Sequence, residues 1–291
     1  MLKIIKIKKT KIKNVDFENL DFGSVFSDHM FTSSFVNGKW DSGVIEPYKP
    51  ISMDPSARAL HYGQACFEGM KAYKDKNGKT WLFRPLENYK RISKSCERLA
   101  MPIPNKEIFM EGLKKLVELD YEWIKPGLGN SLYIRPFVFA DQPSINANEA
   151  NQYKFMIICA PAQLYYSGKV KVKIEKSYSR AAKGGVGYAK AAGNYAAQFY
   201  PTMLARDQGY QQIIWTDSSS HEFIEEAGTM NLFFRIDDTL ITPPTSDSIL
   251  DGITRKSLIE IAKNLGIKVE IRQLSVKEII NAYNSGNLKE I

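Results

Sequence analysis

Two Asn-Gly pairs, each lying between runs of strand-forming residues, constrain the first half of the chain more than any other feature. Asn37-Gly38 lies at the centre of residues 35–40, and Asn77-Gly78 separates residues 71–73 from residues 81–84. An Asn-Gly pair readily adopts the positive φ angles that a tight antiparallel turn needs. The sequence therefore predicts two β-hairpins in this half.

Helices and further strands are predicted from apolar spacing and from turn residues. Pro85 begins a helix over 85–99, and a second helix over 105–119 carries Ile108, Leu113, Leu116 and Val117 on one side. Residues 195–206 favour a helix, as do residues 254–265, which end at Gly266 and direct Leu258, Ile261, Ala262 and Leu265 to the core. Strands are predicted at 1–9, 132–134, 155–158, 170–174, 212–216, 230–234 and 240–242.

This pattern predicts an α+β protein with two domains. A polar, turn-rich stretch over residues 162–168 follows the buried strand at 155–158 and favours a boundary there. We expect a small N-terminal α/β domain over 1–163, an interdomain linker over 164–169 and a larger domain over 170–291.

Composition argues against several classes of function. The net charge of +8 is spread over the chain, and only Lys3 to Lys13 form a dense basic run, so we expect no nucleic-acid partner. No apolar run approaches the roughly 18 residues of a membrane span, and the alternating start does not resemble a secretion signal. We therefore expect a cytoplasmic protein without a membrane partner. The three cysteines and three histidines are widely spaced, which favours neither a disulfide framework nor a metal site.

The first candidate for chemistry is Lys190, which lies in the segment Gly187-Tyr188-Ala189-Lys190-Ala191-Ala192-Gly193-Asn194-Tyr195. A single lysine among small residues suits a nucleophilic amine, because a tight and partly dry pocket lowers the pKa of an ammonium group. Taken alone the pattern is weak, since a lysine beside glycine is commonly solvent-facing.

The second and third candidates follow in the same half of the chain. Glu226 stands just before a turn into an apolar run, so its carboxylate could be fixed inside a site. A surface acid is the alternative, and that interpretation fits Glu225 better. Residues 250–255 form a glycine-containing turn at the start of a helix, which suits a phosphate or, more plainly, ordinary capping.

Together these segments resemble the signature of the class IV pyridoxal-phosphate aminotransferases. The pattern extends from Glu226 through Asn231-Leu232-Phe233 and Leu240-Ile241-Thr242 to Leu250-Asp251-Gly252-Ile253-Thr254-Arg255. The N-terminal half then resembles the branched-chain amino acid aminotransferases. The segments that carry this second likeness are 22–30, 59–73, 131–136 and Lys183-Gly184-Gly185, and the likeness is collinear from about residue 12 onward.

The resemblance implies a fold type IV, D-amino acid aminotransferase-like two-domain fold, with pyridoxal 5'-phosphate bound between the domains and a homodimer as the assembly. It implies that Lys190 is the catalytic residue that also carries the cofactor. The other cofactor-binding residues that it implies are Tyr195, Glu226, Arg91, Ile253 and Thr254. The substrate-binding residues that it implies are Phe26, Tyr62, Phe67, Tyr133, Arg135, Tyr165 and Thr229, with Arg135 pairing with the distal carboxylate of glutamate.

The implied reaction is transamination of L-leucine, L-isoleucine and L-valine with 2-oxoglutarate, in branched-chain amino acid biosynthesis or breakdown. Members of the family continue beyond the position of Ile291 into a Gly-Thr-Ala turn and further strands and helices, so we expect the larger domain to be incomplete at its C-terminus. One alternative is therefore a truncated, catalytically impaired protein with this fold. A less favoured alternative is a D-amino acid aminotransferase.

Overall fold

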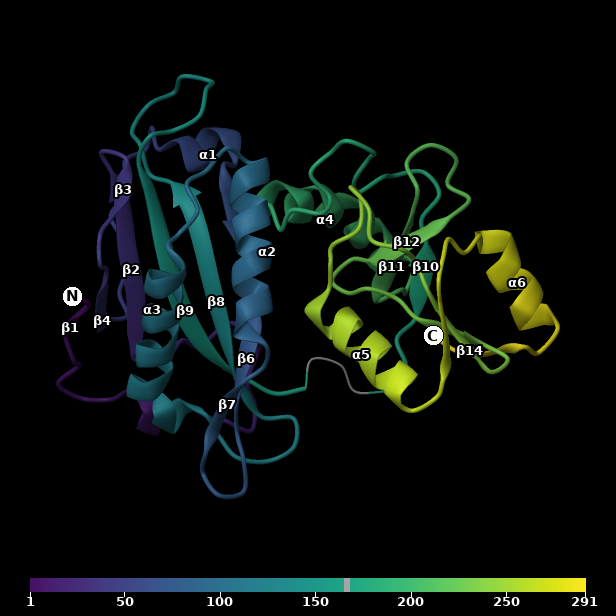
Figure 1. The fold of residues 1–291 in the computed structure, drawn as a ribbon, viewed down its shortest axis with the longest axis horizontal. Coiled ribbons are helices and arrows are strands. Elements are labelled where there is room, and N and C mark those ends of the chain that lie inside the picture. The colour runs from purple at the N-terminus through teal and green to yellow at the C-terminus, as the bar shows by residue number, and fades with distance from the viewer. Residues whose placement is uncertain (165–167) are drawn as a thin grey trace. The chain divides into compact units, whose positions relative to one another are not determined.

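The computed structural model describes residues 1–164 and 168–291, and the chain divides into two compact units, Met1–Ser167 and Gly168–Ile291. We call them unit 1 and unit 2, and Figure 1 shows the elements of each. The predicted α+β class is confirmed, because both units combine sheets with helices.

Unit 1 is built on one mixed sheet of nine strands. Its longest strands, β8 (Ser131–Ala140) and β9 (Tyr153–Ala162), run antiparallel in continuous register from Ser131 opposite Ala162 to Ala140 opposite Tyr153. The strand order is β1-β4-β2-β9-β8-β6-β7, with β3 beside β2 and β5 beside β8. The remaining strands are β1 (Lys3–Ile4), β2 (His29–Val36), β3 (Lys39–Trp40), β4 (Val44–Pro47), β5 (Ala65–Phe67), β6 (Met70–Lys74) and β7 (Thr80–Leu82).

Both predicted hairpins are present in unit 1. Asn37 (φ 53°) and Gly38 (φ 78°) form the turn between β2 and β3. In the second hairpin, between β6 and β7, Gly78 takes the left-handed conformation at φ 79° and the Asp75 amide donates to the Lys79 carbonyl. The strand predicted at residues 1–9 is much shorter, because only Lys3–Ile4 pair with a neighbouring strand.

Helices α2 (Pro85–Arg98) and α3 (Lys106–Leu119) lie over one face of this sheet, and a short helix, α1 (Arg58–Tyr62), precedes β5 (Figure 1). The predicted inner face of α3 is buried at Leu113, Leu116 and Val117, while Ile108 packs at its edge. The sheet approaches α3 closely, since a Cβ at Gly112 would lie 2.8 Å from the ring of Phe31.

Unit 2 contains two small sheets. One has the order β10-β11-β12 and the other has the order β15-β14-β13-β16. A shared apolar core includes Ile214, Phe234, Ile241 and Leu274. The strands are β10 (Val172–Ile174), β11 (Gln212–Thr216), β12 (Ile224–Ala227), β13 (Phe234–Ile236), β14 (Thr239–Thr242), β15 (Lys268–Ile271) and β16 (Leu288–Glu290), and the helices are α4 (Ala192–Asp207), α5 (Ile253–Asn264) and α6 (Val276–Asn284).

The orientation predicted for α5 is right for the buried Ala262 and wrong for the other three apolar residues. The helix ends as expected before Gly266, whose φ is 73°, but Leu258, Ile261 and Leu265 are 43%, 53% and 70% exposed. The buried residues are Ile253, Arg255, Ser257 and Ala262. Arg255 donates to the Thr242 hydroxyl and the Pro243 carbonyl outside the helix, so the buried side is partly polar and hydrophobic spacing alone did not indicate it.

The strand predicted at 230–234 is also largely wrong, because β13 begins only at Phe234. Residues 228–230 bend, and the Asn231 side chain donates to Glu226 and to the carbonyl of Leu250. These bonds hold the segment in a non-extended path. Within the part of the chain that is described, no helix is long and apolar enough to cross a membrane.

Candidate active site

Lys190 lies at the end of a loop that leads into α4, and its side chain reaches the first turn of that helix. The Lys190 Nζ donates to the hydroxyl of Tyr195 at 2.5 Å, and both side chains are half-buried. The loop is fixed from inside by Asn194, whose amide donates to the carbonyls of Val186 (2.8 Å) and Ala189 (2.9 Å). The amine is thus held in one position, partly removed from solvent, beside a phenol that can exchange a proton with it.

A second fixed point of this loop is its contact with the turn at residues 246–249. A Cβ at Gly187 would lie 2.6 Å from the Cα of Ser248, so only glycine permits this approach. The Tyr188 amide donates to the carbonyl of Asp247 at 2.9 Å, and Gly187 accepts from the Arg180 guanidinium at the same distance. The lysine loop and the turn that precedes α5 therefore form one rigid assembly within unit 2.

Glu226, on β12, is the most buried carboxylate of this assembly, at 4% exposure. Its Oε1 lies 2.6 Å from Arg180 Nη2, and its Oε2 accepts from Asn231 Nδ2 at 3.0 Å and from the Leu250 amide at 3.2 Å. Burial raises the pKa of Glu226 to about 7, although Arg180, the Leu250 amide and Lys190 all favour the ionised form. A carboxylate in this state can pair with a cationic group that enters the site.

Glu225 is not the surface acid that the sequence favoured. Its carboxylate accepts a hydrogen bond from the hydroxyl of Ser248, and burial raises its pKa. Arg180 lowers the same pKa and Asp217 raises it. The charge of Arg180 therefore acts on both neighbouring acids of β12.

The start of α5 lies beside Glu226. Its N-cap is Gly252, which has no side chain to accept a hydrogen bond from the first helical amides. The first hydrogen bond of the helix runs from the Lys256 amide to the Gly252 carbonyl. The amides of Ile253 and Thr254 precede that bond and have no carbonyl partner inside the helix, as in the first turn of any α-helix. The dipole adds positive potential there, so this end can hold a phosphate.

Gly252 also sets the distance between α5 and the Asn231 side chain. A Cβ at this position would lie 1.8 Å from Asn231 Oδ1. Asn231 Nδ2 meanwhile bonds to the Leu250 carbonyl at 2.9 Å as well as to Glu226. The glycine of the motif is thus required by close packing against the asparagine that holds the carboxylate.

In unit 1, Arg91 on α2 forms a forked ion pair with Glu68. Its Nε lies 2.7 Å from Oε1 and its Nη2 lies 2.8 Å from Oε2 of Glu68, a residue with no exposed surface. Asn88, one turn earlier on α2, donates to the same Oε2 at 2.7 Å. The arginine predicted to bind phosphate is therefore held by a buried acid, a partner that sequence reasoning did not identify.

Three of the predicted substrate residues lie together on the sheet of unit 1. Arg135 Nη2 donates to the Tyr133 hydroxyl at 2.9 Å, and the Arg135 guanidinium lies over the ring of Phe67 at 4.5 Å. A Cβ at Gly69 would lie 2.2 Å from the Tyr133 hydroxyl, so this glycine makes room for the phenol. The guanidinium therefore lies among aromatic side chains, a setting that accepts both apolar groups and an anion.

The other predicted substrate residues are not part of that cluster. Phe26 stacks on Tyr48 with ring centroids 4.9 Å apart, and the exposed Tyr62 donates to the carbonyl of Ile145. Thr229 belongs to unit 2, where it is exposed just after Glu226. The prediction for Tyr165 falls outside the described residues.

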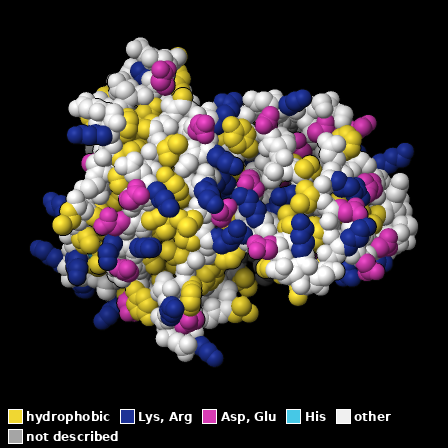
Figure 2. Space-filling view, in the orientation of Figure 1, with side chains coloured by type: hydrophobic (Ala, Val, Ile, Leu, Met, Phe, Trp, Pro, Cys, Tyr) yellow, Lys and Arg dark blue, Asp and Glu magenta, His cyan; other side chains and the backbone are white. Residues whose placement is uncertain are grey.

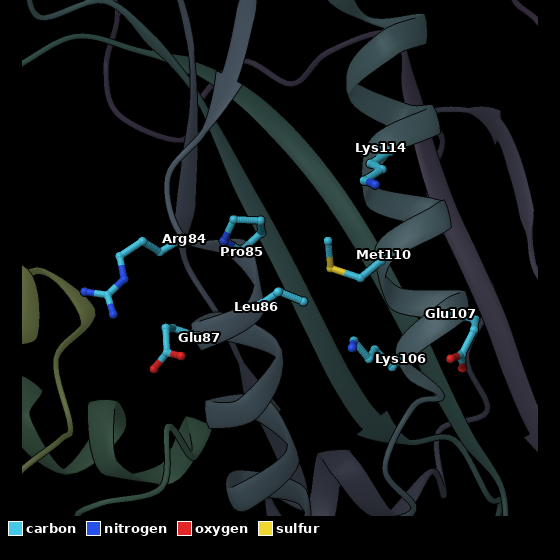
Figure 3. A pocket seen from close by; sticks show the side chains of 8 residues that line it. All are labelled: Arg84, Pro85, Leu86, Glu87, Lys106, Glu107, Met110 and Lys114. Carbon is cyan, nitrogen blue, oxygen red and sulfur yellow. The ribbon is translucent and has the colours of Figure 1, made fainter.

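A surface groove in unit 1 lies between the start of α2 and α3, where Leu86 and Met110 point between the two helices (Figure 3). Figure 2 shows hydrophobic side chains on the visible face of unit 1, with lysine and arginine side chains around them. The groove contains none of the predicted site residues; its lining is Arg84, Pro85, Leu86, Glu87, Lys106, Glu107, Met110 and Lys114. Among the described residues, no cluster of His, Cys, Asp and Glu is arranged to hold a metal ion.

Sequence reasoning missed Arg180, Ser248 and Glu68 as parts of these networks. Arg180 lies ten residues before Lys190 in a stretch of small residues, Ser179-Arg180-Ala181-Ala182, where an arginine has few neighbours of its own size. That setting is a weak signal, and only the fold brings the arginine to Glu226. Glu68 lies within the segment 59–73, but the sequence alone does not show that it is buried.

This chain is similar to known proteins in both sequence and structure. The family described as amino-transferase class IV matches residues 65–285. A probable branched-chain-amino-acid aminotransferase of Staphylococcus aureus (strain MRSA252) is 46% identical over 292 residues, which cover 99% of this chain and 81% of the relative.

Solved structures agree with the sequence relatives. The crystal structure of the branched-chain amino acid aminotransferase of Escherichia coli matches with a TM-score of 0.71 and 28% identity, covering 86% of this chain and 79% of that chain. A branched-chain aminotransferase from the thermophilic archaeon Thermoproteus uzoniensis, solved with norvaline, matches with a TM-score of 0.70 and 25% identity, covering 86% and 80%. A further branched-chain amino acid aminotransferase, complexed with N-(5'-phosphopyridoxyl)-L-glutamate, matches with a TM-score of 0.68 and 28% identity, covering 84% and 78%. With its lysine, buried carboxylate and helix start in one assembly, the chain belongs to the class IV aminotransferases, among the branched-chain-amino-acid aminotransferases.

Proposed function

We propose that this chain is a pyridoxal-phosphate-dependent transaminase that moves the amino group of L-leucine, L-isoleucine or L-valine to 2-oxoglutarate. The products are branched 2-oxo acids and L-glutamate. The observation that carries the proposal is the assembly in unit 2 of a tethered Lys190 Nζ, a buried Glu226 carboxylate and the open start of α5. These groups fit the aldehyde, the ring nitrogen and the phosphate of pyridoxal phosphate.

Each residue of the assembly has a defined task. Lys190 would hold the cofactor through its Nζ, and the same Nζ, when free, would be the base that takes the proton from the substrate Cα. Tyr195, 2.5 Å from that Nζ, keeps the amine in place. Glu226 holds a proton at the ring nitrogen, and the amides of Ile253 and Thr254 bind the phosphate. Pyridoxal phosphate, when bound, supplies the electron sink that accepts the pair left by the Cα–H bond.

Unit 1 would supply substrate selection. Phe67 and Tyr133 are aromatic walls for a branched aliphatic side chain, and Arg135 between them can pair with the second carboxylate of glutamate. Phe26, Tyr62, Tyr165 and Thr229 are the other proposed substrate-binding residues, and Arg91 is a further proposed cofactor-binding residue. A homodimer in the cytoplasm is the proposed state of the protein.

The decisive experiment mixes the full chain with pyridoxal phosphate, L-leucine and 2-oxoglutarate and measures L-glutamate. The Lys190→Ala variant should form no glutamate and lose the absorbance of the lysine-bound cofactor. Lys183→Ala is the matched control, since Lys183 is an exposed lysine of the same loop and should leave both signals intact.

The alternatives give different results in the same assay. Glutamate formation by Lys190→Ala at the rate of the unmodified chain would refute the lysine assignment. Activity on D-alanine without activity on L-leucine would instead indicate a D-amino acid aminotransferase. Cofactor absorbance that does not respond to either amino acid would identify a catalytically impaired member of the family.

A further inference from the structure

Arg180 is the buried cation of unit 2 that lies nearest to Glu226. Its side chain is 4% exposed and that of Glu226 is 5% exposed, with 2.6 Å between Arg180 Nη2 and Glu226 Oε1. The same Nη2 donates to the carbonyls of Gly187 at 2.9 Å and Ser248 at 2.8 Å. Those two carbonyls belong to the lysine loop and to the turn before α5, so the guanidinium is fixed by the same backbone that positions Lys190.

The surroundings of Glu226 show why a cation is needed there. Ionising a carboxylate away from water is costly unless a positive charge or several donors stabilise it. The charged groups facing Glu226 are Arg180, Lys190 and the opposing acid Glu225, and its uncharged donors are Asn231 and the Leu250 amide. Lys190 cannot stabilise the Glu226 carboxylate permanently, because its amine is engaged when it carries the cofactor.

We propose that Arg180 is the positioning residue that keeps the Glu226 carboxylate ionised and oriented for a cationic ring nitrogen. The inference rests on the proposed function, because it takes the protonated pyridine of the cofactor as that cation. When the Lys190 amine is engaged by the cofactor, Glu225 and Glu226 carry two negative charges if both are ionised, against one positive charge on Arg180. The cluster thus lacks one positive charge, which a pyridinium supplies and a neutral ring does not.

The test compares pyridoxal phosphate with 1-deazapyridoxal phosphate, in which a C–H group replaces the ring nitrogen. Equilibrium binding of each to the full cofactor-free chain gives an affinity ratio that reports on the ring nitrogen alone. We expect the unmodified chain to prefer pyridoxal phosphate, and Arg180→Gln to reduce that preference by about tenfold to a hundredfold, to the level of Glu226→Gln. Arg180→Lys, which keeps the charge, should retain most of the preference.

Two outcomes would overturn the inference while leaving the proposed function intact. One is an unchanged affinity ratio in Arg180→Gln, and the other is a ratio in Arg180→Lys as low as in Arg180→Gln. Failure of the unmodified chain to bind pyridoxal phosphate at all would overturn the proposed function and the inference together. If Arg180→Gln does not fold, the double variant with Glu226→Gln decides: recovered folding supports the charge role, and continued failure assigns Arg180 to its carbonyl contacts alone.

Discussion

Replacing Glu226 with glutamine should stabilise the cofactor-free protein by an amount that grows as the pH rises. The unfolded carboxyl has its ordinary pKa of 4.5, whereas burial raises the folded pKa to about 7. Below pH 4.5 the carboxyl is protonated in both states and the pH-dependent cost is absent. Between these pH values the folded state binds more protons than the unfolded state, so the free energy of unfolding falls as pH rises and levels off above about pH 7.

The free energy of unfolding should fall by about 3 kcal/mol in total between these two pKa values, since each pKa unit corresponds to about 1.4 kcal/mol. Glutamine avoids this cost because it cannot ionise. Its carbonyl can still accept from Asn231 and from the Leu250 amide, while its amide would face Arg180 unfavourably. That unfavourable contact is a constant offset, so the change of the difference with pH is the quantity to measure.

Urea unfolding of the full chain, labelled with fluorotryptophan and followed by fluorine NMR, isolates the relevant unit. Trp215 is buried on β11 and is the one tryptophan of the sequence after residue 168, so its signal reports on unit 2. The difference in the free energy of unfolding between Glu226→Gln and the unmodified chain should increase by about 3 kcal/mol between pH 4.5 and pH 8. A gap that stays constant to within about 0.5 kcal/mol over that range would show that the carboxylate ionises without cost, and would refute the reasoning.

Two further pairs of substitutions test the packing around the site and the capping of α6. Gly252→Ala should destabilise unit 2 by about 1–3 kcal/mol in urea unfolding, because the new methyl group would displace Asn231. Gly193→Ala, where a Cβ meets nothing within 4 Å, should be neutral or slightly stabilising, and an equal loss at both sites would contradict the packing argument. Ser275→Ala should cost about 1 kcal/mol, since the Ser275 hydroxyl accepts from the Glu278 amide at 3.0 Å as the N-cap of α6. Ser275→Asp should restore the stability, and no difference between the two variants would exclude a capping role.

Local features of the fold could be predicted from the sequence where local rules decide the structure. The hairpin at Asn37-Gly38, the start of α2 at Pro85 and the end of α5 before Gly266 all depend on the φ angles of one or two residues. The inner face of α3 could be predicted too, because its apolar residues pack into one core with the sheet residues.

The rest of the fold depends on contacts between distant residues. Hydrophobic spacing predicted that Leu258, Ile261 and Leu265 of α5 are buried, yet these residues are exposed and the buried Arg255 bonds to Thr242 and Pro243. A pattern of apolar residues cannot show which polar side chains have buried partners. The same limit explains why the strand predicted at 230–234 does not begin until Phe234.

Part of the candidate site could likewise be predicted from the sequence, and part could not. Lys190, Tyr195 and Glu226 are recognisable in the chain because they lie in compact motifs, and the structure brings the first two within a hydrogen bond of each other. Arg180 and Ser248 are separated from Glu226 by tens of residues and have no motif of their own. Their roles emerge only when the backbone places both beside the two acids of β12.

The forked ion pair of Arg91 with Glu68 has a consequence for the entropy of binding. An arginine side chain loses up to about 2 kcal/mol of rotamer freedom when it is immobilised. Here Glu68 immobilises it during folding, so an anion that meets Arg91 does not have to order a mobile side chain. Lysine at this position would keep the charge but not the fork, and its single ammonium group would remain free to rotate away from Glu68. The choice of arginine over lysine at position 91 therefore determines how far the side chain is ordered before a ligand binds.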